Sequence, residues 1–183
     1  MQPRHITFDH EEGRFNHRVA GVAFSNGRVL LHRGECDDFW SMPGGRVHLF
    51  EPSSEALVRE MREELLTEVR VERLLWVVEN FFSHENRDYH ELGFYYLMSL
   101  PPDSAPCRAR GPFEGIDDAR GPFEGIDDTM KIIFQWFDLD LLGTLPIYPT
   151  FLREGLRNLP EHVQHLVHRD PTAANQSEER GEK

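Results

Sequence analysis

Cysteine and lysine are both scarce in this chain. Of its 183 residues, only Cys36 and Cys107 are cysteines, and only Lys131 and Lys183 are lysines. Two cysteines are too few for a disulfide framework, and neither stands in a CxxC pair or beside a histidine at the spacing of a zinc site. We therefore expect two ordinary reduced thiols.

Long apolar segments are missing as well. No run approaches the ~20 residues that a membrane-spanning helix requires. Residues 1–15 lack the basic region followed by an apolar stretch that marks a signal peptide. These two absences predict a cytoplasmic protein that makes no membrane contact.

Positive charge is outnumbered throughout the chain. There are 32 acidic residues against 20 lysines and arginines, which gives a formal net charge of -12. A nucleic-acid binder needs a basic patch. Every group of basic residues here is interleaved with acids, so we expect no nucleic-acid partner. An anionic ligand would need a divalent cation to bridge it to the protein.

Residue patterns predict a single domain of mixed α/β (α+β) class. Asn26-Gly27, between two strand-like runs, is a strong hairpin signal. Residues 54–66 and 148–159 have the composition of helices. The expected strands cover residues 18–24, 28–33, 39–45, 68–82, 91–100 and 130–139.

The decapeptide ARGPFEGIDD occurs twice in succession, at residues 109–118 and 119–128. Its period is too short for a stacking structural repeat. A surface loop absorbs such an insertion easily, because doubling a loop's length costs only ~0.6 kcal/mol. We therefore expect a loop that holds one working copy and a spare.

Three glutamates share one face of the predicted helix, because Glu60, Glu63 and Glu64 stand at positions i, i+3 and i+4. Their mutual repulsion is relieved if a hard divalent cation lies among them, and Mg²⁺ prefers carboxylate oxygens. By itself the pattern also fits an acidic face in contact with solvent.

The surrounding sequence resembles the Nudix box. The segment GRVHLFEPSSEALVREMREELLT fits the pattern of Gly, five residues, Glu, seven residues, Arg-Glu, an aliphatic residue, any residue and Glu-Glu. The resemblance covers about residues 18 to 160. The matching positions are Gly45, Glu51, Arg59, Glu60, Met61, Glu63 and Glu64.

The resemblance implies a Nudix-like α/β/α sandwich with a mixed central sheet. Residues 1–16 would then form an N-terminal lead-in, residues 17–168 the Nudix domain, and residues 169–183 a disordered tail.

The chain departs from the box at three positions. Phe50 replaces the glycine before the first glutamate, and Leu66 replaces the glycine after the acidic pair. Thr67 replaces the aliphatic residue that follows. A leucine in the left-handed conformation costs ~1–2 kcal/mol, so we expect an altered C-terminus of the helix.

The resemblance also implies roles for the box residues. Glu60 and Glu64 would bind Mg²⁺ or Mn²⁺, with Glu63 as a third ligand and the main-chain carbonyl of Gly44 as a fourth. Arg59 would orient the glutamates through charge-assisted hydrogen bonds. Arg59, Glu60 and Glu63 therefore form the predicted catalytic set within the box.

Some members of the family take a general base from a distant loop. Glu114 and Glu124 are the same residue of the two decapeptide copies, and we favour Glu124 because it lies nearer the strand expected at 130–139. The candidate substrate-binding residues are Arg33, His48 and Glu51.

The implied activity is divalent-metal-dependent hydrolysis of the pyrophosphate bond in a nucleoside diphosphate linked to another moiety. The partner would be a small-molecule nucleotide derivative, and a homodimer is one option because dimers are common in the family. The alternative is a nucleotide-binding or regulatory module with little or no hydrolysis. Its motivation is the altered positions Phe50 and Leu66.

Overall fold

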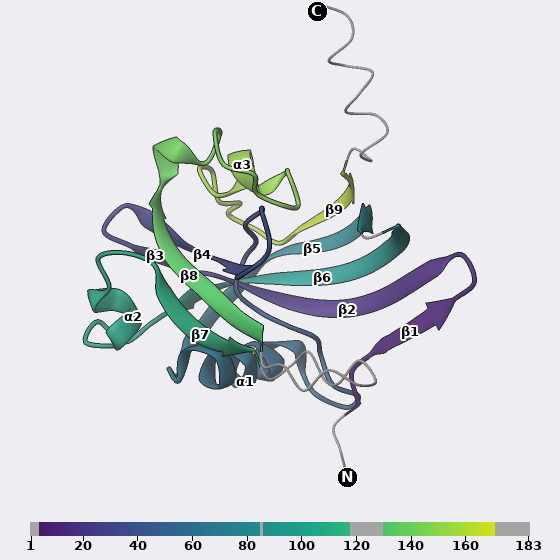
Figure 1. Cartoon of the computed structure of the whole chain (residues 1–183), viewed down its shortest axis with the longest axis horizontal. Helices are drawn as coiled ribbons and strands as arrows, with labels where there is room; N and C mark the ends of the chain where they lie inside the picture. The colour runs from purple at the N-terminus through teal and green to yellow at the C-terminus, as the bar shows by residue number, and fades with distance from the viewer. Residues whose placement is uncertain (1–3, 85, 118–129, 171–183) are drawn as a thin grey trace, which may run out of the picture.

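The computed structural model of the protein describes residues 4–84, 86–117 and 130–170. Its strands form two sheets, which lie between α1 (Ser53–Leu65) on one side and α3 (Leu152–Gly155) on the other (Figure 1). This arrangement confirms the predicted α/β/α sandwich with a mixed sheet. None of the helices in the described part of the chain has the length and apolar character of a membrane span.

The first sheet is mixed and has five strands in the order β1-β2-β6-β5-β9. The β2–β6 and β5–β9 pairs are parallel, whereas β1–β2 and β5–β6 are antiparallel. Strand β1 and the first four residues of β2 lie in the segment 1–16, which was expected as a lead-in. The strands are β1 (Thr7–His10), β2 (Gly13–Val22), β5 (Arg70–His84), β6 (Arg87–Ser99) and β9 (Gln164–Arg169).

The second sheet is antiparallel and has four strands in the order β3-β4-β8-β7. Asn26 and Gly27 both have positive φ, 52° and 75°, as a two-residue hairpin of the predicted kind requires. They connect β3 to β4, so the hairpin is confirmed. The strands are β3 (Phe24–Ser25), β4 (Arg28–Gly34), β7 (Phe113–Asp117) and β8 (Met130–Asp138).

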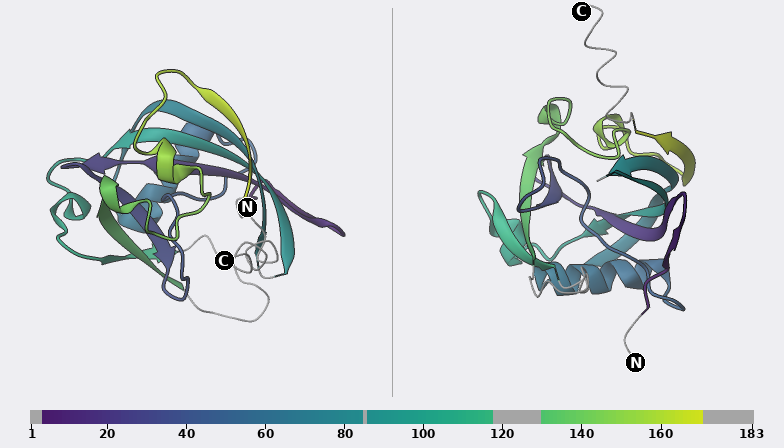
Figure 2. Two further views of the ribbon diagram at one scale, coloured as in Figure 1. Left: turned by 90° about the horizontal axis from the view of Figure 1, so that it is seen from above. Right: turned by 45° about the vertical axis from the view of Figure 1, so that its right-hand side comes forward.

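Helix α1 covers the mixed sheet with the apolar side that its sequence provides. Leu57 and Met61 are fully buried, and such burial contributes about 1.5–3 kcal/mol for each side chain. They pack with Val19 of β2, whereas the next residue, Ala20, belongs to a second core cluster. Strand alternation therefore gives β2 one face toward α1 and one toward the space between the sheets. Figure 2 shows α1 lying across the strands (right view).

The C-terminal part differs from the sequence expectation. The helix expected at 148–159 is reduced to the single turn α3, which ends at Gly155. Gly155 lies close to the Trp76 ring. Residues 164–169, for which no element was expected, form strand β9 beside β5. The remaining short helices are α2 (Ala105–Arg108) and η1 (Leu139–Leu141).

The strand expected at 39–45 is reduced to isolated bridges. Ser41 pairs with His32, and Trp40 pairs with Ile147. This segment instead connects β4 to the glycine pair at 44–45.

The expectation that α1 ends in an altered way is also wrong. Leu66 adopts the left-handed conformation that glycine usually supplies, with φ 50° and ψ 33°, and its N–H bonds to the carbonyl of Met61. Phe50 likewise has a φ of 68°. Their side chains are 79% and 95% exposed, so little packing offsets the backbone strain.

Replacing either of these residues with glycine should therefore stabilise the protein. We expect Leu66→Gly to raise the free energy of unfolding by about 1 kcal/mol, after allowing for the greater freedom of glycine in the unfolded chain. Phe50→Gly should act similarly, and the two effects should add. Urea denaturation measures both.

The control for that prediction is Leu66→Ala, which removes the exposed apolar side chain but keeps a Cβ. It should bring no gain. If alanine stabilises as much as glycine does, backbone strain is not the cause.

The first copy of the decapeptide is more than a loop. It supplies β7, whose Gly115 lies so close to the end of α1 that a Cβ there would be 2.6 Å from the main-chain oxygen of Glu64. Glu114 of this strand is exposed and lies 3.4 Å from the amine of Lys131. The second copy, with Glu124, lies outside the described residues, so the role of Glu124 stays a prediction.

The register of β7 and β8 makes removal of one copy a specific test. Asp117 is paired with Met130. Deleting residues 119–128 would leave two residues between them, which is the length of a tight hairpin connection. Deleting 109–118 instead gives the same polypeptide, because the copies are identical.

We expect this deletion to change the free energy of unfolding by less than about 1 kcal/mol and to leave activity nearly intact. Thermal unfolding followed by circular dichroism measures the first effect. The control deletes both copies, 109–128, which removes β7 and should destabilise the protein strongly. Equal damage from the two deletions would contradict the proposed register.

Candidate active site

The segment Gly44-Gly45 brings main chain against both β2 and α1. Gly44 has a φ of 145°, and a Cβ there would lie 2.2 Å from the carbonyl oxygen of Val19. A Cβ on Gly45 would lie 2.1 Å from Oε2 of Glu60. Glycine is therefore required at both positions, and the close approach places the Glu60 carboxylate directly beneath this turn.

Arg59 connects three glutamates. Its Nε donates to Oε1 of Glu51 at 2.8 Å, and its Nη1 donates to Glu60 at 2.8 Å and to Glu63 at 3.0 Å. Burial lowers the pKa of Arg59, but these carboxylates more than offset burial and hold the pKa above its usual value. The guanidinium therefore stays charged and fixes the glutamates, as the resemblance implies.

Glu60 has the property expected of a cation ligand. Its side chain is fully buried, and Oε1 accepts the hydrogen bond from Arg59. Within the described part of the protein, Oε2 has no hydrogen-bond partner. Burial raises the pKa of this carboxyl, and Arg59 counteracts only part of that effect. A buried, unsatisfied carboxylate oxygen is costly, and a divalent cation would remove the cost.

The other two glutamates of the predicted ligand set differ from each other. Glu64 is buried, with its Oε2 3.9 Å from Nδ1 of His32. Glu63 has a side chain that is 41% exposed and turned to Arg59. Among residues 4–84, 86–117 and 130–170, no three His, Cys, Asp or Glu side chains are grouped closely enough to hold a metal. The ligand set therefore stays a prediction, for which Glu60 and Glu64 are better placed than Glu63.

The carbonyl oxygen of Gly44 already has a partner. Nη2 of Arg18, from β2, donates to it at 3.1 Å. Arg18 is also within electrostatic reach of Glu60, Glu64 and Glu91, and their charges raise its pKa against the lowering effect of burial. A carbonyl oxygen has two lone pairs, so this bond leaves one for a cation.

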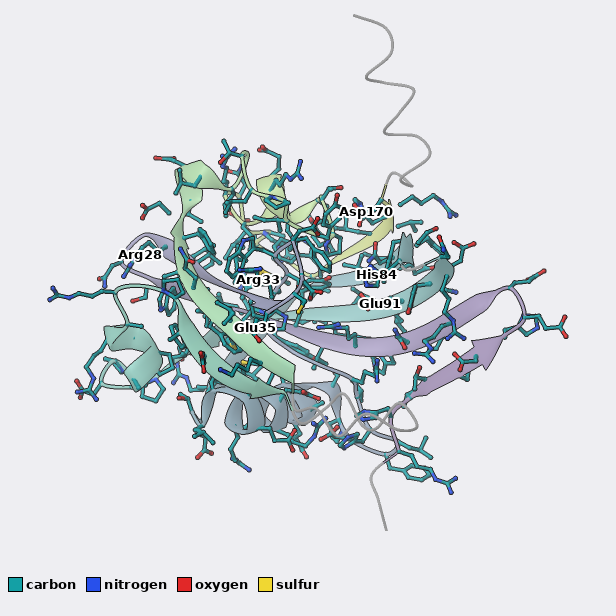
Figure 3. All side chains as sticks on the ribbon, viewed as in Figure 1. Arg28, Arg33, Glu35, His84, Glu91 and Asp170 are labelled. Carbon is teal, nitrogen blue, oxygen red and sulfur yellow. The ribbon has the colours of Figure 1, made fainter. Side chains whose placement is uncertain are left out.

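A cleft of about 620 Å³ opens beside these residues, between the two sheets. Five basic side chains line it although the protein as a whole is acidic. Five acidic side chains face them. The basic residues are Arg14, Arg18, Arg33, Arg46 and Lys131, and the acidic ones are Asp37, Asp38, Glu64, Glu91 and Asp170. Figure 3 shows Arg33, Glu91 and Asp170, which come from different elements.

Aromatic side chains form the outer wall of the cleft. Phe39 meets His84 and Tyr148 edge to face, with ring centroids 5.9 and 5.7 Å apart. Phe82 and Tyr89 stack in parallel at 4.9 Å on neighbouring strands. Such rings offer flat surfaces to a planar group within the cleft.

The predicted substrate-binding residues divide between two places. Arg33 lines the cleft, where its guanidinium bonds to the main chain of Asp37 and lies 5.3 Å from the Trp40 ring centroid. His48 and Glu51 are not among the cleft-lining residues. Hydrogen bonds from Arg59 and from the His48 N–H hold the pKa of Glu51 below its usual value despite burial. Their substrate role stays a prediction.

The predicted site residues do not include three of the polar residues that line the cleft. Arg18, Asn80 and Glu91 all face it from neighbouring strands of the mixed sheet. Strand alternation is the signal that could have found them, since polar residues interrupt apolar runs at 80 and 91. Strand pairing brings them into one cleft, and the sequence does not reveal that pairing.

This chain is similar to known proteins in sequence and in fold. The Bacillus subtilis (strain 168) protein named "Putative ADP-ribose pyrophosphatase YjhB" is 31% identical over 83 residues, which are 45% of this chain. The chain spans only 40% of that relative's length.

Two solved structures share the fold at low sequence identity. An ADP-ribose pyrophosphatase from Streptococcus suis 89-1591 matches with a TM-score of 0.52 and 16% identity over 83% of this chain and 98% of its own. A UDP-X diphosphatase matches with a TM-score of 0.50 and 19% identity over 82% of this chain and 66% of its own.

The family assignment rests on a match that is independent of these individual proteins. The family described as the NUDIX domain matches residues 15–159. This stretch contains the glycine pair, the Arg59 network and most of the cleft, and it makes up well over half of the chain. The protein therefore belongs to the NUDIX domain family, as the resemblance of residues 45–67 predicted.

Proposed function

We propose that this protein is a divalent-metal-dependent hydrolase that cleaves the pyrophosphate bond of a nucleoside diphosphate linked to another moiety. The observation that carries the proposal is the buried Glu60 carboxylate, with an unsatisfied oxygen, beside a cleft lined by basic side chains. Family membership and the names of the relatives, which act on ADP-ribose or UDP derivatives, support the same class of substrate.

The positions of the side chains suggest a different role for each. Glu60 and Glu64, with the Gly44 carbonyl, would hold Mg²⁺ or Mn²⁺, and Arg59 keeps Glu60 and Glu63 oriented. A bound divalent ion supplies neutralisation of phosphate charge and a lowered pKa of an attacking water. The arginines of the cleft provide positive charge for the remaining phosphate oxygens.

The cleft also accommodates the rest of such a substrate. Its volume of about 620 Å³ is within the range of small-molecule sites. The aromatic wall around Phe39 and Tyr148 suits a nucleobase. We propose Mg²⁺ or Mn²⁺ as the ion, and the cytoplasmic location and the homodimer stay predictions.

The alternative of a binding module without hydrolysis loses its motivation. It was based on Phe50 and Leu66, the two positions without the family's glycine. Both adopt positive φ, so the turn and the helix end keep the geometry that glycine would give.

Glu60→Gln and Glu64→Gln test the proposal. Each should lower kcat on the order of 100-fold or more, because each removes charge at the predicted metal site. Released nucleoside monophosphate is measured with ADP-ribose and UDP-sugars under Mg²⁺ or Mn²⁺, and calorimetry should show weaker Mn²⁺ binding. Glu55→Gln, at an exposed position of the same helix, is the matched control and should retain activity. Full, still metal-dependent activity of both site variants would refute the assignment.

A further inference from the structure

A row of four polar residues crosses the mixed sheet. The register pairs Asn16 with Glu91, Glu91 with Asn80, and Asn80 with His168, so the four occupy equivalent positions on β2, β6, β5 and β9. Asn16, Glu91 and Asn80 line the cleft, and all three are buried. Buried positions of a sheet are usually apolar, so the burial of these polar residues requires an explanation.

Asn80 and Glu91 together present hydrogen-bond acceptors to the cleft. The Asn80 amide donates to the Glu91 carboxylate, which leaves the carbonyl end of the amide for other partners. Oδ1 of Asn80 is buried and has no partner within the described residues. A ligand that donates hydrogen bonds at this point would satisfy an acceptor that is otherwise left unpaired at a cost.

Arg18 connects these acceptors to the predicted metal site. One of its nitrogens donates to the Gly44 carbonyl, and its guanidinium is also in electrostatic contact with Glu91. The acceptors therefore lie in the same cleft as Gly44 and Glu64, beside the predicted metal site and not within it. In a nucleotide the sugar is the group bonded directly to the phosphate, and the base lies farther away.

We propose that Glu91 and Asn80 accept hydrogen bonds from the vicinal hydroxyls of a ribose, and so select ribonucleoside over 2′-deoxyribonucleoside diphosphate derivatives. The inference rests on the proposed function and deepens it. A carboxylate that binds a ribose 2′-hydroxyl is known from dinucleotide-binding folds. A diol supplies two O–H donors, which match the two acceptors.

Other occupants fit less well. A phosphate group would place negative charge against Glu91, whereas the arginines and the predicted metal site offer it a better location. The hydrogen-bonding edge of a nucleobase carries acceptors as well as donors, and neither Glu91 nor the Asn80 carbonyl can pair with those acceptors. The aromatic side chains Phe39, Tyr148 and Phe82 provide surfaces for the base elsewhere in the cleft.

The test compares matched substrates that differ only in the 2′-hydroxyl. ADP-ribose and UDP-glucose are each paired with the derivative that carries 2′-deoxyadenosine or 2′-deoxyuridine. The wild type should prefer the ribonucleoside form by about 10- to 100-fold in kcat/KM, because without the hydroxyl a buried acceptor is left unpaired.

Glu91→Gln and, independently, Asn80→Ala should lower kcat/KM for the ribonucleoside form and bring the preference toward 1. Activity on the deoxy form should change little. Glu79→Gln is the matched control, because Glu79 is next to Asn80 on β5 and pairs with His165 on the other face of the sheet. It should leave the preference unchanged.

Three results would overturn the proposal. They are equal kcat/KM for the paired substrates in the wild type, an equal loss on both forms in the variants, and a preference that follows the base instead of the hydroxyl. If no pyrophosphate bond is cleaved at all, the proposed function fails. Calorimetric binding of AMP and 2′-deoxy-AMP in the presence of Mn²⁺ then still decides the ribose preference. Asn80→Ala keeps the test available if Glu91→Gln does not fold.

Discussion

The burial of the Glu60 carboxylate is the constraint on which the rest of the site depends. A carboxylate taken out of water must be hydrogen-bonded, paired or neutralised. Here Arg59 satisfies one oxygen, and the backbone of Gly45 comes so close to the other that no larger residue would fit. Helix α1, the glycine turn and strand β2 must therefore keep one relative position, and the cleft opens next to it.

The same constraint explains why the box tolerates two missing glycines and requires two others. Leu66 and Phe50 extend into solvent, so each substitution costs only local backbone strain. At Gly44 and Gly45 a Cβ would collide with the carbonyl of Val19 or with the carboxylate of Glu60. The position of the backbone, and not the family pattern alone, decides which glycine is essential.

The charge of the cleft differs from the net charge of the whole protein. The net charge is -12, and no basic patch is visible along the sequence. Folding nevertheless brings five basic side chains from β2, β4, β8 and the segment after the glycine pair to one cleft. Five acidic side chains face them, so acidic and basic groups are equal in number in the cleft while acids dominate the chain as a whole. An anionic ligand is thus compatible with an acidic protein.

The sequence by itself determined the elements that depend on local chemistry. These are the Asn26-Gly27 hairpin, helix α1 with its apolar stripe, the Arg59 network and the family. Only the tertiary structure decided the rest. It reduced the expected C-terminal helix to the single turn α3, added strand β9, gave the first decapeptide copy a place in a sheet, and brought Arg18, Asn80 and Glu91 together. Strand pairing joins residues that are far apart in the chain, and local propensity carries no record of those partners.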